Sequence, residues 1–144
     1  MPDWVAEGYA DYAKRLPRDF ALDLIELKPE PRDRGKSVPQ LLAAEGKRIR
    51  AACDGFRMIA LDERGKAWTT RELAERLTRW RESAIDVAFV IGSADGLDPG
   101  IKRDADDVVA LSSLTLPHGL VRVIVAEQLY RATSLLSGHP YHRE

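Results

Sequence analysis

The sequence predicts an α/β fold built on a parallel sheet. Short apolar runs at 57–61 and 86–91 are almost free of polar residues, which is typical of strands buried on both faces of such a sheet. The segments between the runs repeat apolar residues at helical spacing and begin with helix start signals. Strands that alternate with helices in this way indicate a parallel sheet covered on both faces.

The first third of the chain predicts a helix, a strand, a loop and a second helix. Residues 4–15 carry apolar side chains at helical spacing and end in basic residues before a proline. FALDLIEL at 20–27 alternates apolar and acidic residues and predicts a half-buried strand. The charged, proline-containing KPEPRDRGKS that follows predicts a loop. PQLLAAEGKRIRAAC at 39–53 opens with proline in a first-turn position and predicts the second helix.

The middle of the chain has the clearest boundaries. The strand at 57–61 is followed by a polar turn and then by Thr69 and Glu72, which form a capping-box pattern for a helix that runs to about Trp80. The strand at 86–91 ends in the turn-rich GSADGLDPG.

The last third predicts a short helix, a strand and a long helix. The short helix begins at Pro99, and VVALSSL at 108–114 predicts the strand. The stretch 120–136 is rich in β-branched residues, but its uninterrupted length favours a helix. Because its first half is apolar all round, this helix is expected to lie deep in the fold.

Composition narrows the class of protein. A chain of 144 residues with 44% hydrophobic residues and a net charge of -1 is typical of one soluble domain. The single cysteine, Cys53, excludes an internal disulfide, suits a reducing cytoplasm and is expected to be buried filler. No apolar run reaches the roughly 18 residues of a membrane span, and the first residues lack the pattern of a signal peptide. We expect a cytoplasmic protein with no membrane partner.

One segment could bind phosphate in spite of the nearly neutral net charge. Residues 28–50 carry seven basic and three acidic side chains, a local surplus that favours either a phosphate-binding patch or an ordinary solvated face.

Three turn-rich segments follow the predicted strands and could hold a ligand. They are LDERGKAW after residue 60, GSADG from residue 92 and LSSLTLPHG from residue 111. Ligands of parallel sheets collect at the carboxyl ends of the strands. No Walker sequence and no Gly-x-Gly-x-x-Gly after the first strand is present, which disfavours a phosphate-cradling loop. No Cys/His cluster at metal spacing is present either, so no metal is expected.

The histidines raise two questions of their own. His118 precedes the predicted last helix and could be a cap or core residue or a functional one. The chain ends HPYHRE, which is either a loose tail or a segment that something holds. Tyr141, His142 and Arg143 offer a stacking ring, a titratable base and a fixed cation, which suit an RNA base and its phosphate.

Motifs along nearly the whole chain resemble one family. LTLPHGLVRVIVAEQLYRA and HPYHRE, together with MPDWV, LDERGKAW and FVIGSADGL, are similar to the RlmH family, the 23S ribosomal RNA (pseudouridine-N3)-methyltransferases of the SPOUT superfamily. The resemblance implies a single domain over 1–144 with a deep trefoil knot at about 86–137 and a functional tail at 138–144. Family members normally begin with a short strand before MPDWV, and this usual first strand is missing here, through a late start assignment or a shortened protein.

The same resemblance implies a cofactor, a substrate and partners. S-adenosylmethionine is expected in the knot, and the enzyme is expected to act as a homodimer on a pseudouridine in 23S rRNA of the assembled ribosome. The alternative is a catalytically inactive module that binds ribosomes and keeps the fold. Carried onto this sequence, the cofactor contacts fall at Leu61, Gly92, Leu111, Ser112, Ser113, Leu114, Thr115 and Leu116.

The tail receives the catalytic roles. Methyl transfer to an imide nitrogen requires that the N3 proton leaves, so a base is useful. The hypothesis assigns Tyr141 to orienting the base, His142 to N3 deprotonation and Arg143 to phosphate or the developing charge, with His118 as a support near the cofactor.

Overall fold

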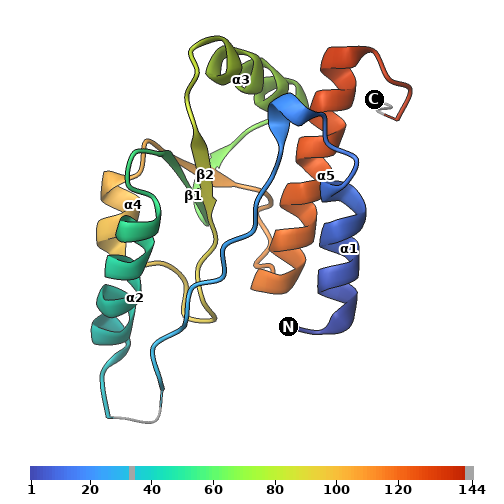
Figure 1. Ribbon diagram of the computed structural model, residues 1–144. Helices are drawn as coiled ribbons and strands as arrows, with labels where there is room; N and C mark the ends of the chain where they lie inside the picture. The colour runs from blue at the N-terminus through green and yellow to red at the C-terminus, as the bar shows by residue number, and fades with distance from the viewer. Residues whose placement is uncertain (33–34, 142–144) are drawn as a thin grey trace. The chain divides into compact units, whose positions relative to one another are not determined.

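The computed structural model describes residues 1–32 and 35–141, and these form two compact units (Figure 1). The sheet unit contains residues 25–67 and 86–115. The helical unit contains residues 1–24 and 68–85 and the chain from 116 onward. Each unit is built from segments that are distant in sequence, so neither could be delimited as a continuous stretch of chain.

The sheet unit is built on three parallel strands, as predicted. They are β1 (Arg57–Ala67), β2 (Val87–Val90) and β3 (Asp107–Ala110), arranged in the order β2-β1-β3. In the register, Ala60 lies opposite Val90 of β2 and Val108 of β3. β1 is therefore the central strand, and its residues Ile59 and Ala60 are fully buried.

Two helices of the sheet unit, α2 (Val38–Ala52) and α4 (Pro99–Asp104), pack against one face of the sheet. The Ser37 hydroxyl caps α2 by accepting a hydrogen bond from the backbone N–H of Gln40. The Gln40 side-chain oxygen in turn accepts one from the backbone N–H of Ser37. Between these helices and the sheet lies an apolar cluster, which consists of Met58, Ala60, Val90, Leu97 and Ile101, with Ile49, Cys53, Ala105 and Val108 packed around it. Cys53 is half-buried against this cluster, and burial raises the pKa of its thiol.

The helical unit is organised around α5 (His118–Ser137), against which α1 (Asp3–Ala13) and α3 (Thr70–Glu82) both pack. A short 3-10 turn, Arg18–Phe20, follows α1. The capping box of Thr69 and Glu72 is confirmed at the start of α3. Val125 and Ala126 of α5 are buried and the other apolar side chains of its first half are half-buried, so α5 lies in the interior of the helical unit, as expected, although not every face of it is fully covered. None of the helices in the described ranges has the length and apolarity to cross a membrane.

The predicted strand at 20–27 is wrong. Residues 21–30 form no regular element, and none of the three described strands pairs with them. Leu24, Ile25 and Leu27 are exposed, Ile25 at 65%. A strand exists only when a partner satisfies its backbone groups, and side-chain alternation alone cannot supply that partner.

Two strand boundaries differ from the prediction for local reasons. β1 continues to Ala67, because the predicted polar turn is looped out of it: both Leu61 and Lys66 lie opposite Val109. β3 ends at Ala110 and does not reach 114. The Ser112 hydroxyl accepts a hydrogen bond from the backbone N–H of Leu114 at 2.9 Å, which bends the chain away from the ladder.

Candidate functional site

Three of the predicted ligand segments meet at one edge of the sheet unit. Leu61 lies opposite Val109 of β3, Gly92 comes two residues after β2 ends, and Leu111 directly follows β3. Because all three strands are parallel and in register, their carboxyl ends lie at the same edge. The fold thus brings the predicted cofactor residues from 61, 92 and 111–115 together.

The segment looped out of β1 is held by three polar contacts. Asp62 accepts hydrogen bonds from Lys102 Nζ at 2.8 Å and from the backbone N–H of Arg64 at 2.9 Å. Burial raises the pKa of the Asp62 carboxyl, but these two donors outweigh it and hold the pKa below its ordinary value of 3.8. The Thr115 hydroxyl donates to Glu63, which ties this segment to the one after β3.

The segment after β3 presents apolar side chains beside hydroxyl groups. Leu111 and Leu114 are exposed, Leu114 at 70%, and they lie among Ser112, Ser113 and Thr115. Large exposed apolar side chains next to polar groups are typical of a surface that a ligand covers.

The turn after β2 is closed tightly upon itself. The backbone N–H of Gly96 donates to the carbonyl of Ser93 at 2.9 Å, and Gly96 has a φ of 88°, which favours glycine. A Cβ on Gly92 would lie 2.6 Å from the carbonyl carbon and oxygen of Gly96. Both glycines of the predicted turn are thus required, one by conformation and one by space.

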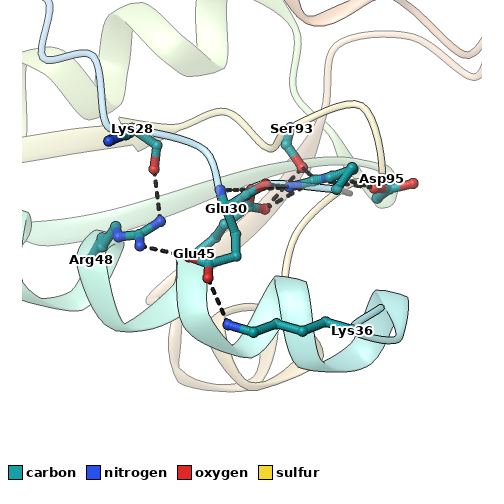
Figure 2. A network of polar contacts seen from close by, with 8 residues as sticks. Lys28, Glu30, Lys36, Glu45, Arg48, Ser93 and Asp95 are labelled. Atoms are coloured by element: carbon teal, nitrogen blue, oxygen red, sulfur yellow. Dashed lines mark hydrogen bonds and ion pairs between the residues drawn. The ribbon is translucent and has the colours of Figure 1, made fainter. Parts of the chain in front are cut away.

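A buried carboxylate holds this turn from the side (Figure 2). Glu45 of α2 accepts from the Ser93 hydroxyl at 3.0 Å, from Arg32 Nη1 at 2.6 Å and from the backbone N–H of Glu30 at 3.0 Å. Arg32 in turn donates to Asp95 at 3.1 Å and to Ser93 at 2.9 Å. Burial raises the pKa of the Glu45 carboxyl, but its hydrogen-bond donors lower that pKa by more, so it lies below the ordinary value of 4.5.

The basic segment 28–50 is largely neutralised by this arrangement and its neighbours. Glu30 pairs with Lys36 at 2.7 Å and with Arg48 at 2.6 Å (Figure 2). Arg50 pairs with Asp104 at 2.5 Å. Asp33 and Arg34 lie outside the described residues. The described part of the segment therefore favours the solvated-face interpretation over a phosphate-binding patch.

The remaining predicted residues belong to the helical unit. Leu116 is half-buried, and His118 is the first residue of α5 and is exposed. The N-cap of α5 is Pro117 and no side chain caps it, so His118 is neither a cap nor a core residue. Its functional interpretation stays a prediction.

The described part of the tail folds back onto α5. Gly138 ends the helix with a φ of 71°, and the backbone N–H of His139 donates to the carbonyl of Ser134 at 2.9 Å. The Tyr141 hydroxyl donates to Glu127 at 2.7 Å, and its ring centroid lies 4.5 Å from that of Tyr130. His142 and Arg143 lie outside the described residues. The tail is therefore held at least as far as Tyr141.

The environment of Tyr141 fixes its protonation state. Burial raises the pKa of its phenol above the ordinary 10.0, and the hydrogen bond to Glu127 raises it further. Glu127 is itself bound by Arg131 at 2.8 Å, and the Arg131 guanidinium lies over the Tyr141 ring at 4.9 Å. Tyr141 is thus a neutral hydrogen-bond donor that anchors the tail.

We expect Tyr141→Phe to loosen the tail with little change in global stability. A hydrogen bond to a charged acceptor contributes about 1.5–3 kcal/mol, and Phe keeps the ring contacts while removing that bond. Faster trimming by carboxypeptidase would report the change. The control is Tyr9→Phe, since the Tyr9 hydroxyl has no hydrogen-bond partner among the described residues. Equal trimming of both variants would contradict the anchoring role.

Sequence reasoning missed the polar side chains that hold the turn and the tail. A signal for Glu45 was present: it occupies the apolar face of its helix, between Leu41 and Ile49 at helical spacing. A carboxylate on a buried face needs a partner, but the sequence could not tell which of the many nearby cations it would meet. In residues 1–32 and 35–141 no group of three or more His, Cys, Asp or Glu side chains could hold a metal ion.

Comparison with known proteins gives consistent results. A family model described as "Predicted SPOUT methyltransferase" matches residues 1–142. The chain is 58% identical over 144 residues to "Ribosomal RNA large subunit methyltransferase H" of Nitrosospira multiformis, covering 99% of this chain and 92% of that protein. It is 54% identical, with the same coverage, to proteins of that name from Burkholderia lata and Burkholderia cenocepacia.

Proposed function

Because the chain belongs to the SPOUT methyltransferase family, we propose that it transfers a methyl group from S-adenosylmethionine to N3 of a pseudouridine in 23S rRNA of the assembled ribosome. The names of its relatives support a large-subunit RNA substrate. The observation that carries the proposal is the meeting of three ligand segments, from 61, 92 and 111–115, at the carboxyl edge of a parallel sheet.

The residues at that edge suit S-adenosylmethionine. The exposed side chains of Leu111 and Leu114 offer apolar cover for an adenine ring. In the turn that starts at Gly92, a Cβ added at Gly96 would meet no atom within 4 Å, so a ligand can approach the backbone there without meeting a side chain. Asp62 is already bound by Lys102, so recognition there falls to backbone groups and hydroxyls. Leu116, which adjoins this set in sequence, completes the proposed cofactor contacts.

The chemistry requires little more than position and one proton acceptor. S-adenosylmethionine supplies a methyl group on a sulfonium, which a deprotonated ring nitrogen can accept. Precise alignment of the reacting groups supplies about 7–11 kcal/mol in favourable cases. We assign N3 deprotonation to His142, the developing charge or a phosphate to Arg143, orientation of the base to the Tyr141 ring, and support near the cofactor to His118.

The proposal extends to assembly and location. A ribosomal substrate implies action in the cytoplasm. We propose a homodimer, in keeping with the RlmH resemblance, and a ribosome whose shape supplies much of the recognition. The paired charges of the basic segment support this last point, since Arg32, Lys36 and Arg48 are already neutralised by carboxylates.

One assay separates this proposal from an inactive ribosome-binding module. With labelled S-adenosylmethionine and ribosomes that lack the modification, we expect label to enter 23S rRNA at a pseudouridine. Unmodified free 23S rRNA is the control and should accept far less label. Ribosome binding by the folded protein without incorporation of label would favour the inactive module and overturn the enzymatic proposal.

A further inference from the structure

We propose that Glu45 is a positioning residue, which holds the turn from Gly92 to Gly96 in its cofactor-binding shape through Ser93 and Arg32. The inference rests on the proposed function, since it assigns that turn to S-adenosylmethionine. Glu45 itself lies on α2 and is assigned no contact with the cofactor.

The first link is direct. Glu45 Oε1 accepts a hydrogen bond from the Ser93 hydroxyl at 3.0 Å, and the Glu45 side chain is only 11% exposed (Figure 2). A buried carboxylate that is well supplied with donors is a rigid acceptor. Its helix is fixed in turn by Leu41 and Leu42, both buried. Through Glu45, the Ser93 side chain is therefore held in place by the packed core of the sheet unit.

The second link passes through Arg32. Its guanidinium donates to Glu45 Oε2 at 2.6 Å and, with other nitrogens, to Asp95 at 3.1 Å and Ser93 at 2.9 Å. The planar fork of arginine fixes the angles between its partners. One carboxylate thus holds the turn at two residues, on either side of Ala94.

The turn needs this outside support because of its own composition. It begins and ends with glycine, and Gly96 occupies the left-handed region that glycine enters without strain. Its backbone closes on itself between Ser93 and Gly96, where the N–H of Gly96 donates to the carbonyl of Ser93. The two glycines allow the observed backbone conformation of the turn but also allow other conformations. The network of side chains around Glu45 therefore selects the observed one.

Glu30 offers a matched control within the same network. Its side chain is also 11% exposed, and it pairs with two cations, Lys36 and Arg48, where Glu45 pairs with Arg32. Among the described residues, however, its carboxylate binds only side chains of the segment 28–50 and makes no bond to the turn. Glu30→Gln and Glu45→Gln therefore remove the same charge from equally covered side chains, and only Glu45→Gln weakens an acceptor that binds the turn.

The test measures cofactor binding and turn mobility in the full-length protein. By calorimetry, Glu45→Gln should weaken S-adenosylmethionine binding about five- to thirtyfold, the factor expected from losing part of a charged hydrogen-bond network, and Glu30→Gln by about twofold or less. In steady state the KM for S-adenosylmethionine should rise in Glu45→Gln, while kcat at saturating cofactor stays near wild type. Amide hydrogen exchange at 92–96 should accelerate in Glu45→Gln alone.

Each outcome decides between positioning and mere stability. Equal loss of affinity in the two glutamine variants, or unchanged exchange at 92–96 in Glu45→Gln, would overturn the inference. Ser93→Ala should reproduce part of the effect, and combining it with Glu45→Gln should add less than the sum, because the two side chains share one bond. Failure of the wild-type protein to bind S-adenosylmethionine would instead contradict the proposed function, and the exchange measurement would still decide the role of Glu45.

Discussion

Replacing His142 with alanine is expected to slow single-turnover methylation of ribosomes by about 10²- to 10⁴-fold, the range that a positioned general base contributes. The physical reason is the proton on N3 of pseudouridine, which must leave for the nitrogen to accept a methyl group. In the proposed mechanism His142 accepts it. The rate is measured with saturating S-adenosylmethionine, so that a change in cofactor affinity does not enter.

Two comparisons make the result specific to a base. His139→Ala makes the same exchange three residues earlier. It removes an acceptor for the backbone N–H of Tyr141, at 3.1 Å, and a ring contact with Tyr130, so a much smaller loss is expected. Free imidazole in the buffer should restore part of the rate of His142→Ala, since it supplies the missing acceptor. Full single-turnover methylation by His142→Ala would show that the base assignment is wrong.

Gly92→Ala is expected to weaken S-adenosylmethionine binding by about ten- to a hundredfold. The new Cβ would lie 2.6 Å from the carbonyl carbon and oxygen of Gly96 and 3.0 Å from the backbone nitrogen of Leu97. These are backbone atoms, and Leu97 is anchored in the apolar cluster, so the turn itself must shift. Overpacking typically costs about 1–3 kcal/mol, and every 1.4 kcal/mol is tenfold in affinity. Calorimetry of cofactor binding measures the effect.

A second glycine separates a local effect from general destabilisation. Gly55 precedes β1 at its amino end and has a φ of 83°, and a Cβ added there would meet no atom within 4 Å. Gly55→Ala should lower the free energy of unfolding by about 1–2 kcal/mol through backbone strain and leave cofactor affinity unchanged. If both alanine variants lost affinity to the same extent, the turn at Gly92 would not be the cofactor site.

The described part of the tail is anchored on the last helix. Glu127 and Tyr130 hold Tyr141 against α5. The tail is therefore not a loose end as far as it is described. An anchored segment loses less conformational freedom when it binds a substrate than a free one does.

Local patterns were sufficient for most elements. The helices α1 to α5 and the strands β1, β2 and β3 all overlap predicted elements, because helix caps, apolar periodicity and turn residues act within a few positions of the chain. The three predicted ligand segments were located by the same patterns: two follow β2 and β3, and the third is looped out of β1 between Leu61 and Lys66. The family followed from motifs spread over nearly the whole chain, and the match over residues 1–142 confirms it.

Features that depend on partners distant in sequence could not be predicted from local patterns. FALDLIEL has the alternation of a strand but no described strand beside it, and a ladder needs two members. The basic segment looks like a phosphate patch until Glu30 and Glu45 are placed among its cations. The hold of Glu45 on Ser93 spans 48 positions, and that of Glu63 on Thr115 spans 52. Sequence patterns report what a residue needs, but only the folded chain brings a particular distant side chain within hydrogen-bond distance to meet that need.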